Sequence, residues 1–301
     1  MKQPLPCIFL LAVLLLGPVA FSREESSVET WLKSGNQKYL HGDYDGAIAD
    51  FTEAIHFYPN LAEPYCNRAA AREKKGDHDG AIADSTEAIH IAPTFAAAYF
   101  NRGVAREHKG DHAGAIADCT EALRIDPSLA EAYHTRGIAR ENKGDRQGAI
   151  ADFTAAIRID LKHVEAYYNR GVARARQGDL KGAIADYTEA IALNPKYAEA
   201  YGNRSVAREQ KGDHDGAIAD CTEAIRINPK FSVAYYNRAN SRNEKGDHDG
   251  AIADYTEAIR LDPKYAEAYY NRGVARERKG DRQGAAADYD EAIRLKPKLG
   301  R

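Results

Sequence analysis

Small and apolar residues recur along the chain at intervals of three to five positions, the spacing of helices that pack along one side. One stretch shows the pattern at Tyr99 and Gly103 and then at Ala115, Cys119 and Ala122. A glycine-aspartate pair lies between the two groups and divides them. The pattern therefore predicts two helices joined by a short turn, and no segment of the chain is predicted to be a strand.

The same pattern returns every 34 residues. The string Gly-Asp-x-x-Gly-Ala begins at Gly42, Gly76, Gly110, Gly144, Gly178, Gly212, Gly246 and Gly280. Eight repeats without insertion or deletion fill residues 28–299, so no second domain is expected. The predicted repeats are 28–61, 62–95, 96–129, 130–163, 164–197, 198–231, 232–265 and 266–299.

Glycine, aspartate and proline mark the ends of the two helices in each repeat. Gly42 and its equivalents end the first helix, because glycine readily adopts positive φ. Asp43 and its equivalents follow, and we expect them to cap the second helix by accepting a hydrogen bond from a free N–H group. Pro59 and its equivalents end the second helix. Gly46 and its counterparts lie early in that helix, where glycine costs about 1 kcal/mol relative to alanine; close helix approach is the reason we expect.

The repeat resembles the tetratricopeptide repeat, whose signature places aromatic, glycine, alanine and proline residues at fixed positions over 34 residues. The first repeat shows the signature as Trp31, Gly35, Ala47, Phe51, Ala54 and Pro59. The last shows it as Tyr269, Gly273, Ala285, Tyr289, Ala292 and Pro297. The resemblance implies an all-α fold: an α-solenoid, a right-handed superhelix of stacked antiparallel helix pairs with a concave inner groove. Each pair would gain its core from its neighbours.

Seven repeats depart from this signature by carrying two arginines four residues apart on the first helix, such as Arg204 and Arg208. Such a pair shares a face and repels, so it needs an anion if it is partly buried. An aspartate such as Asp186 recurs once per second helix, and the first repeat carries Ser34 and Lys38 instead of arginines. We hypothesise that the aspartate of one repeat bonds the arginines of the next, so that Asp186 meets Arg204 or Arg208. The alternative is a solvated charged face.

The first 22 residues have the order of a secretory signal peptide: Lys2, an apolar run that ends at Leu16, the breaker Gly17-Pro18 and small residues up to Ser22. We expect cleavage after Ser22, a short leader over 23–27, and a protein that is exported to a periplasm or secreted. The apolar run is too short for a stable membrane span, which needs about 20 residues. A buried core helix, the alternative interpretation, would carry a polar face.

Charge and cysteine usage narrow the range of partners. The chain has 42 Lys plus Arg and 45 Asp plus Glu, interleaved, for a net charge of -3. No nucleic-acid partner is expected, because phosphate binding needs a concentrated basic face. Beyond the predicted signal peptide the cysteines are Cys66, Cys119 and Cys221, an odd number at wide spacing. They predict neither a disulfide framework nor a metal knuckle.

No motif of a phosphate loop, a nucleophile elbow or a dinucleotide site occurs in the chain. The same carboxylates recur in every repeat, whereas a catalytic acid and base need different environments. Histidines occupy one position beside acidic residues at His78, His112, His214 and His248. A calcium loop would need a bidentate glutamate where Thr86 stands. We therefore interpret the histidines as part of a structural turn and expect no catalysis, no cofactor and no metal.

In the resembled family one side of each first helix lines the inner groove, which binds extended peptides or partner helices. That position holds Asn67, Asn101, Asn169, Asn203, Asn237 and Asn271. Aromatic residues precede four of these asparagines: Phe100, Tyr168, Tyr236 and Tyr270. The column is similar to the asparagine ladder in the repeat region of O-linked N-acetylglucosamine transferase. Because an amide both donates and accepts, it can bind a peptide backbone, and aromatic side chains are enriched at interfaces.

These observations predict a non-catalytic scaffold that binds an extended peptide or a partner helix in the groove. Val104, Val172, Val206 and Val274 give the groove an apolar floor. Thr135 interrupts the asparagine column, so the contiguous lining runs from Asn169 to Asn271. Two alternatives stay open. The asparagines could instead cap or bridge neighbouring helices. The chain could also be a self-associating structural element of an exported assembly, a homo-oligomer joined end to end through its last repeat and Trp31.

Overall fold

The computed structural model describes residues 25–300 of the chain, and within them it contains sixteen α-helices, one short 3-10 helix and no strand. The predicted signal peptide, 1–22, lies outside the described residues, as do the first two residues of the predicted leader. Each predicted repeat contains one pair of helices joined by a tight turn, although the first helix begins three residues before its repeat.

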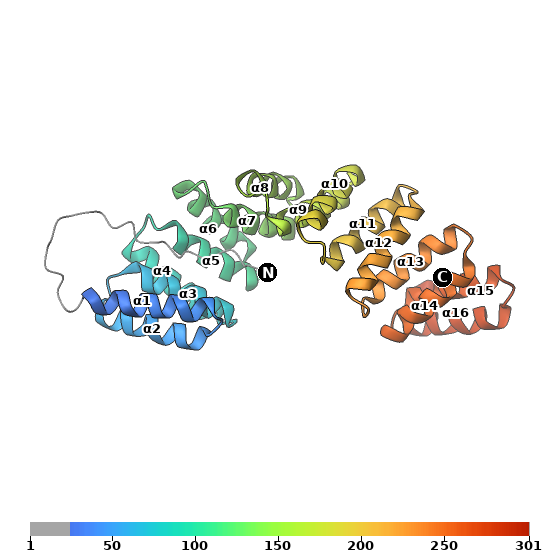
Figure 1. Cartoon of the computed structure of the whole chain (residues 1–301), viewed down its shortest axis with the longest axis horizontal. Coiled ribbons are helices and arrows are strands. Elements are labelled where there is room, and N and C mark those ends of the chain that lie inside the picture. The colour runs from blue at the N-terminus through green and yellow to red at the C-terminus, as the bar shows by residue number, and fades with distance from the viewer. Residues whose placement is uncertain (1–24, 301) are drawn as a thin grey trace. The chain divides into compact units, whose positions relative to one another are not determined.

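The described residues divide into two compact units at Asp160–Leu161. Figure 1 labels their helices. The N-terminal unit contains α1 (Glu25–Leu40), α2 (Tyr44–Phe57), α3 (Ala62–Lys74), α4 (His78–Ile91), α5 (Ala96–His108), α6 (His112–Ile125), α7 (Ala130–Asn142) and α8 (Arg146–Ile159). The C-terminal unit contains α9 (Val164–Gln177), α10 (Leu180–Leu193), α11 (Ala198–Gln210), α12 (His214–Ile227), α13 (Ser232–Glu244), α14 (His248–Leu261), α15 (Ala266–Arg278), α16 (Arg282–Leu295) and the 3-10 helix Pro297–Gly300. A division at this point was not predicted, because the 34-residue pattern continues through it.

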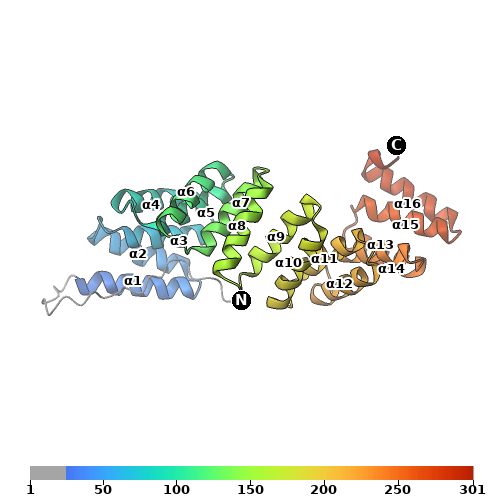
Figure 2. The ribbon, with the colours of Figure 1, turned by 90° about the horizontal axis from the view of Figure 1, so that it is seen from above.

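Consecutive helices pack against each other along each unit, and the first helix of a repeat also contacts the first helix of the next repeat (Figure 2). In the N-terminal unit these additional contacts join α1, α3, α5 and α7, and in the C-terminal unit they join α9, α11, α13 and α15. The predicted all-α fold of consecutively packed helix pairs is thus confirmed. The first helices of each unit form a row, which determines the side chains that can share a surface.

The core between the two helices of a repeat depends on small residues. A Cβ added to Gly103 on α5 would lie 2.9 Å from the Sγ of Cys119 on α6, and one added to Gly171 on α9 would lie 2.8 Å from the ring of Tyr187. Ala115 is fully buried beside this contact. Glycine on the first helix therefore makes room for the larger residue that the second helix brings against it.

The ends of the helices follow the predicted turn chemistry. Gly212 adopts a φ of 79°, and its seven equivalents have φ values between 80° and 89°. The Asp213 carboxylate accepts a hydrogen bond of 2.9 Å from the backbone N–H of Gly216. A Cβ at Gly216 would lie 2.2 Å from Oδ2 of Asp213, and its three closest atoms all belong to that side chain. The capping carboxylate therefore excludes a side chain at this glycine. The expected close helix approach adds to this at counterparts such as Gly114, where the Cδ of Arg106 on the first helix would lie 2.8 Å from the added Cβ.

Candidate functional site

A buried carboxylate neutralises two arginines in each of seven repeats. Asp220 on α12 is 3% exposed and Arg204 on α11 is 9% exposed. The Nε and Nη2 groups of Arg204 donate to the two oxygens of Asp220 at 2.9 and 2.6 Å, and Nη1 of Arg208 donates to Oδ2 at 2.9 Å. A solvated charged face is therefore wrong for these residues. The aspartate supplies the anion that a partly buried arginine pair requires.

The register predicted for these pairs was also wrong. Asp186 bonds Arg170 at 2.6 Å and Arg174 at 2.8 Å, both on the first helix of its own repeat. The same pairing within a repeat joins Arg68 to Asp84, Arg102 to Asp118, Arg136 to Asp152, Arg238 to Asp254 and Arg272 to Asp288. In the first repeat Lys38 takes the place of the arginines and bonds Asp50 at 2.7 Å. The aspartate faces its own first helix because the two helices of one repeat share the core described above.

The arginine, and not the aspartate, connects neighbouring repeats. Nη1 of Arg204 donates a 3.0 Å hydrogen bond to the hydroxyl of Thr188 on α10, in the preceding repeat. Its guanidinium also lies over the ring of Tyr201, 5.5 Å from the centroid, in a cation–π arrangement. With its carboxylate, its threonine and its tyrosine, this arginine is fully engaged in the architecture and is not available to a ligand.

In the N-terminal unit the predicted asparagines are buried between helices. The side-chain amide of Asn101 on α5 donates to the backbone carbonyl of Cys66 on α3 at 3.0 Å, and that of Asn67 donates to the side chain of Asn36 on α1 at 3.3 Å. Phe100 packs half-buried against the core around Leu123. In this unit the asparagines bridge neighbouring first helices, which is the alternative that the sequence left open.

In the C-terminal unit the predicted tyrosines and asparagines bond each other across repeats. The Asn203 amide donates to the hydroxyl of Tyr168 at 2.9 Å, and the Asn271 amide donates to the hydroxyl of Tyr236 at 3.0 Å. Asn169, Asn237 and Tyr270 are not fully buried. In each pair the asparagine lies on the first helix of the repeat that follows the tyrosine's repeat. The pairs therefore hold neighbouring first helices in register. A role of these residues in peptide binding stays a prediction.

Two adjoining hollows lie on the row of first helices in the C-terminal unit. One, of about 480 Å³, is lined by α9, α10 and α11, with Tyr168, Val172 and Asn203 among its residues. The other, of about 190 Å³, is lined by α11 and α13 and includes Asn237. Val206, which is 38% exposed, lines both. We call this surface the α9–α13 hollow. Its further lining residues are Ala175, Arg176, Leu180, Tyr187, Ser205, Ala207, Glu209, Gln210, Asn240 and Ser241.

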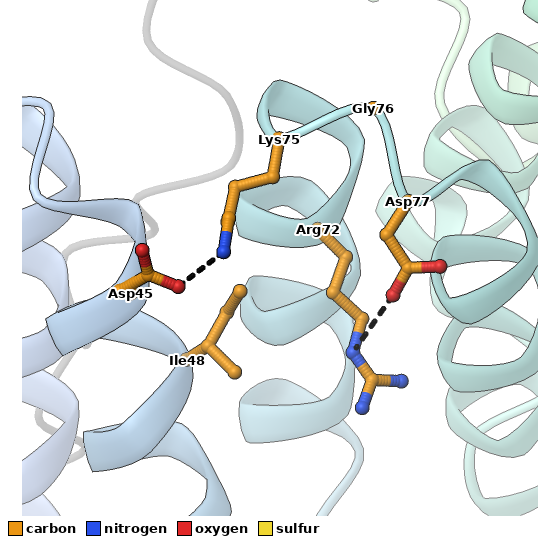
Figure 3. Close-up of a pocket in the computed structure, with 6 residues that line it drawn as sticks. All are labelled: Asp45, Ile48, Arg72, Lys75, Gly76 and Asp77. Carbon is orange, nitrogen blue, oxygen red and sulfur yellow. Dashed lines mark hydrogen bonds and ion pairs between the residues drawn. The ribbon is translucent and has the colours of Figure 1, made fainter.

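A third hollow, of about 510 Å³, lies in the N-terminal unit between α2, α3 and the turn that leads to α4 (Figure 3). Its charged side chains bond each other: Lys75 pairs with Asp45, and Nε of Arg72 lies 3.7 Å from the Asp77 carboxylate. Sequence reasoning did not predict this hollow. Since its cations and anions are paired, it offers no uncompensated charge to a ligand.

The three cysteines among residues 25–300 are buried and form no disulfide. Burial is the main cause that raises the pKa of the Cys119 thiol to about 12 and that of the Cys221 thiol to about 11. At neutral pH both are protonated, and a thiol rather than a thiolate is a poor nucleophile. Cys119 and Cys221, both on second helices, therefore fill space in the core and provide no reactive group.

Paired helices that repeat in register and pack only on their neighbours within a unit define an α-helical repeat protein. The chain belongs to the tetratricopeptide repeat family. Family models described as TPR repeat match residues 35–76 and 239–280, and models described as tetratricopeptide repeat match 96–129, 130–163, 164–197, 198–231, 221–253 and 266–299. Proteins of this family are typically non-enzymatic scaffolds with protein or peptide partners.

Solved structures of the same fold extend the comparison. The chain is 30% identical to the MamA protein, covers 94% of it with 57% of its own length, and superposes with a TM-score of 0.53. It is 23% identical to YrrB, described as a TPR protein with an unusual peptide-binding site, with 62% and 97% of the two chains covered and a TM-score of 0.57. The chain is 18% identical to a tetratricopeptide repeat protein from Parabacteroides merdae. The match covers 87% of this chain and 99% of that protein, with a TM-score of 0.56.

No curated protein matches the chain. None of the helices in the described part of the chain combines the length and the apolar character that crossing a membrane requires.

Proposed function

We propose that this protein is a non-catalytic interaction scaffold that binds an extended peptide or a partner helix in the α9–α13 hollow. The observation that carries the proposal is the position of this hollow. It lies on the first helices, where the sequence predicts the binding surface, and it includes Tyr168, Asn203 and Asn237 from the predicted set.

The lining of the hollow has the composition of a peptide site. Val172 and Val206 provide an apolar floor, and Asn237, Asn240 and Gln210 provide amide groups around it. Concave sites that bind other molecules combine an apolar surface with a few polar groups that set orientation. A bound segment would place apolar side chains against Val206 and its backbone polar groups against the amides.

Substitution of Val206 by lysine tests this proposal. V206K places a charged chain at the position that both hollows share, and Val206 is exposed enough to be replaced without loss of the fold. V274K on α15 changes the equivalent valine of another repeat, outside the α9–α13 hollow, and is the matched control. In affinity capture from the native source, we expect V206K to lose the partner that wild type and V274K retain. Equal capture by all three proteins would contradict the proposal.

The predicted N-terminal signal supports export of the scaffold to a periplasm or its secretion. N-terminal sequencing of the native protein is expected to begin at Arg23, whereas a native chain that retains Met1 would contradict export. The interleaved charges argue against nucleic acid as the partner. Nothing in the function proposed here calls for a cofactor.

The second candidate function is end-to-end self-association. Exposed apolar side chains on the outermost helix pairs favour it, namely Leu40 and Phe57 in the first repeat and Ile293 in the last. Trp31, however, already stacks on Phe57 with ring centroids 4.9 Å apart, so it is engaged within its own repeat. Light scattering distinguishes the two functions: the scaffold is expected to be a monomer, and a concentration-dependent oligomer would favour self-association.

A further inference from the structure

Two histidines and one glutamate from adjacent repeats converge in the N-terminal unit. Glu73 lies in the last turn of α3, His78 is the first residue of α4, and His108 is the last residue of α5. Nδ1 of His78 lies 2.9 Å from one Glu73 oxygen, and Nδ1 of His108 lies 2.5 Å from the other. One ligand atom from each of the three residues lies within 4.8 Å of the other two.

The local structure holds both histidines in place. Asp77, which precedes His78, caps α4 through the backbone N–H of Gly80 at 2.9 Å. Lys109, which follows His108, forms an ion pair with Asp79 on α4. The two elements that carry the histidines are therefore joined beside the cluster.

Burial of the cluster is graded from one side to the other. The Glu73 side chain is 11% exposed, that of His78 is 32% exposed and that of His108 is 58% exposed. A cation at this position would have an anchored carboxylate on its protein side and room for water ligands on its solvent side. This is the arrangement of a site with three protein ligands and an open coordination position.

The chemistry of the three donors selects a class of cation. An ionised carboxylate can only accept hydrogen bonds, so each histidine donates its Nδ1–H to Glu73. When the imidazole proton resides on Nε2 instead, each Nδ1 atom carries a lone pair that can bind a cation, without a change in net charge. Two imidazoles and a carboxylate suit Zn²⁺ and the neighbouring divalent transition metals, whereas Ca²⁺ and Mg²⁺ prefer oxygen ligands.

We propose that Glu73, His78 and His108 form a binding site for a divalent transition-metal ion, with Zn²⁺ as its probe. The ion connects two consecutive repeats, because His108 belongs to the repeat that follows the one carrying Glu73 and His78. Its chemical effect is to replace the two hydrogen bonds to Glu73, one within a repeat and one between repeats, by metal–ligand bonds. The proposal is independent of the α9–α13 hollow, which lies in the other unit.

The next repeat supplies a matched comparison. His112 bonds Glu107 at 2.9 Å, as His78 bonds Glu73, but Asn142 takes the place of His108 and donates its amide to Glu107 at 2.7 Å. The geometry is thus reproduced with one imidazole missing. The amide nitrogen that Asn142 turns toward Glu107 has no lone pair to offer a metal, so this cluster lacks the second imidazole ligand.

Zn²⁺ titration of the full chain, purified with a histidine-free tag and monitored by competition with a chromophoric chelator, tests the proposal. We expect H78Q and H108Q to weaken Zn²⁺ binding by at least about tenfold, since loss of an outer-shell partner alone costs 10- to 100-fold. H112Q is expected to bind as wild type does. Circular dichroism establishes that each variant keeps its helices.

A gain-of-site variant makes the test sharper. N142H completes the second cluster with Glu107 and His112, and it is expected to bind one further Zn²⁺ equivalent. Equal Zn²⁺ affinity of wild type and H108Q would overturn the proposal. Failure of N142H to bind additional Zn²⁺ would contradict the claim that this geometry is sufficient.

Discussion

At the scale of single residues, the turn between the two helices of a repeat contains two glycines that are required for different reasons. Gly212 has positive φ and no atom within 4 Å of where its Cβ would lie, so only the backbone requires glycine there. Gly216 has ordinary helical geometry, and the carboxylate of Asp213 requires it instead. The sequence predicts the first reason from the helix end, but not the second, because the position of a capping oxygen depends on atomic geometry.

A double-mutant cycle tests this explanation of Gly216. We expect G216A to destabilise wild type by about 1 kcal/mol, because the new Cβ displaces the capping carboxylate. In a D213A background the same change is expected to stabilise by up to about 1 kcal/mol, since alanine then contributes only its better helix propensity. Urea denaturation measures both. The same sign of effect in the two backgrounds would show that the cap does not impose the glycine.

The buried thiol of Cys119 predicts a dependence of stability on alkaline pH. Its pKa is raised to about 12 in the fold, mainly by burial, from an ordinary value near 9. As the pH rises between these values, the unfolded chain releases the proton while the folded chain retains it, so the free energy of unfolding decreases.

Comparison with C119A isolates this contribution from that of the other titratable groups. Between pH 8 and pH 10.5 wild type is expected to lose on the order of 1–2 kcal/mol more stability than C119A. Urea unfolding at the two pH values measures the difference. Parallel pH profiles of the two proteins would contradict the raised thiol pKa.

At the scale of helices, sequence periodicity predicts the elements well and their polar partners poorly. The 34-residue period, the glycines and the prolines locate the helix pairs, because these signals act within a few residues. These signals do not predict the partner of Asp186. Arg170 before it and Arg204 after it lie at similar distances along the chain, so spacing favours neither. Only the packing of α9 against α10 within one repeat decides between them.

The same packing predicts that the stability of the α11–α12 pair depends on the carboxylate of Asp220. D220A leaves the buried guanidinium group of Arg204 without its anion and leaves Arg208 with only Asp213, 3.6 Å away. This is expected to cost about 3–5 kcal/mol of unfolding free energy. The control is E223A, which removes the exposed partner of Arg226 on the same helix and is expected to leave the unfolding midpoint unchanged. Urea denaturation followed by circular dichroism measures both, and similar midpoints for D220A and E223A would contradict the buried role.

At the scale of the whole molecule, the repeat pattern predicts the family but not the division into two compact units. The 34-residue period is unbroken where they meet, and the local signal there is only Leu161 in the place of the usual proline. Nor does the asparagine column separate structural from binding roles. Asn101 and Asn203 occupy equivalent positions, yet one is buried against a backbone carbonyl and the other lines a hollow.

The scaffold function is tested most directly by hydrogen exchange of the protein with and without the partner that wild type captures. Binding in the α9–α13 hollow is expected to slow exchange in α9, α11 and α13, and in α10 where Leu180 and Tyr187 line the hollow, and to affect α12 and α14 less. V206K is expected to show no such protection at the same partner concentration. Protection confined to the second helices, or to the N-terminal unit, would contradict a binding surface on the first helices of residues 161–300.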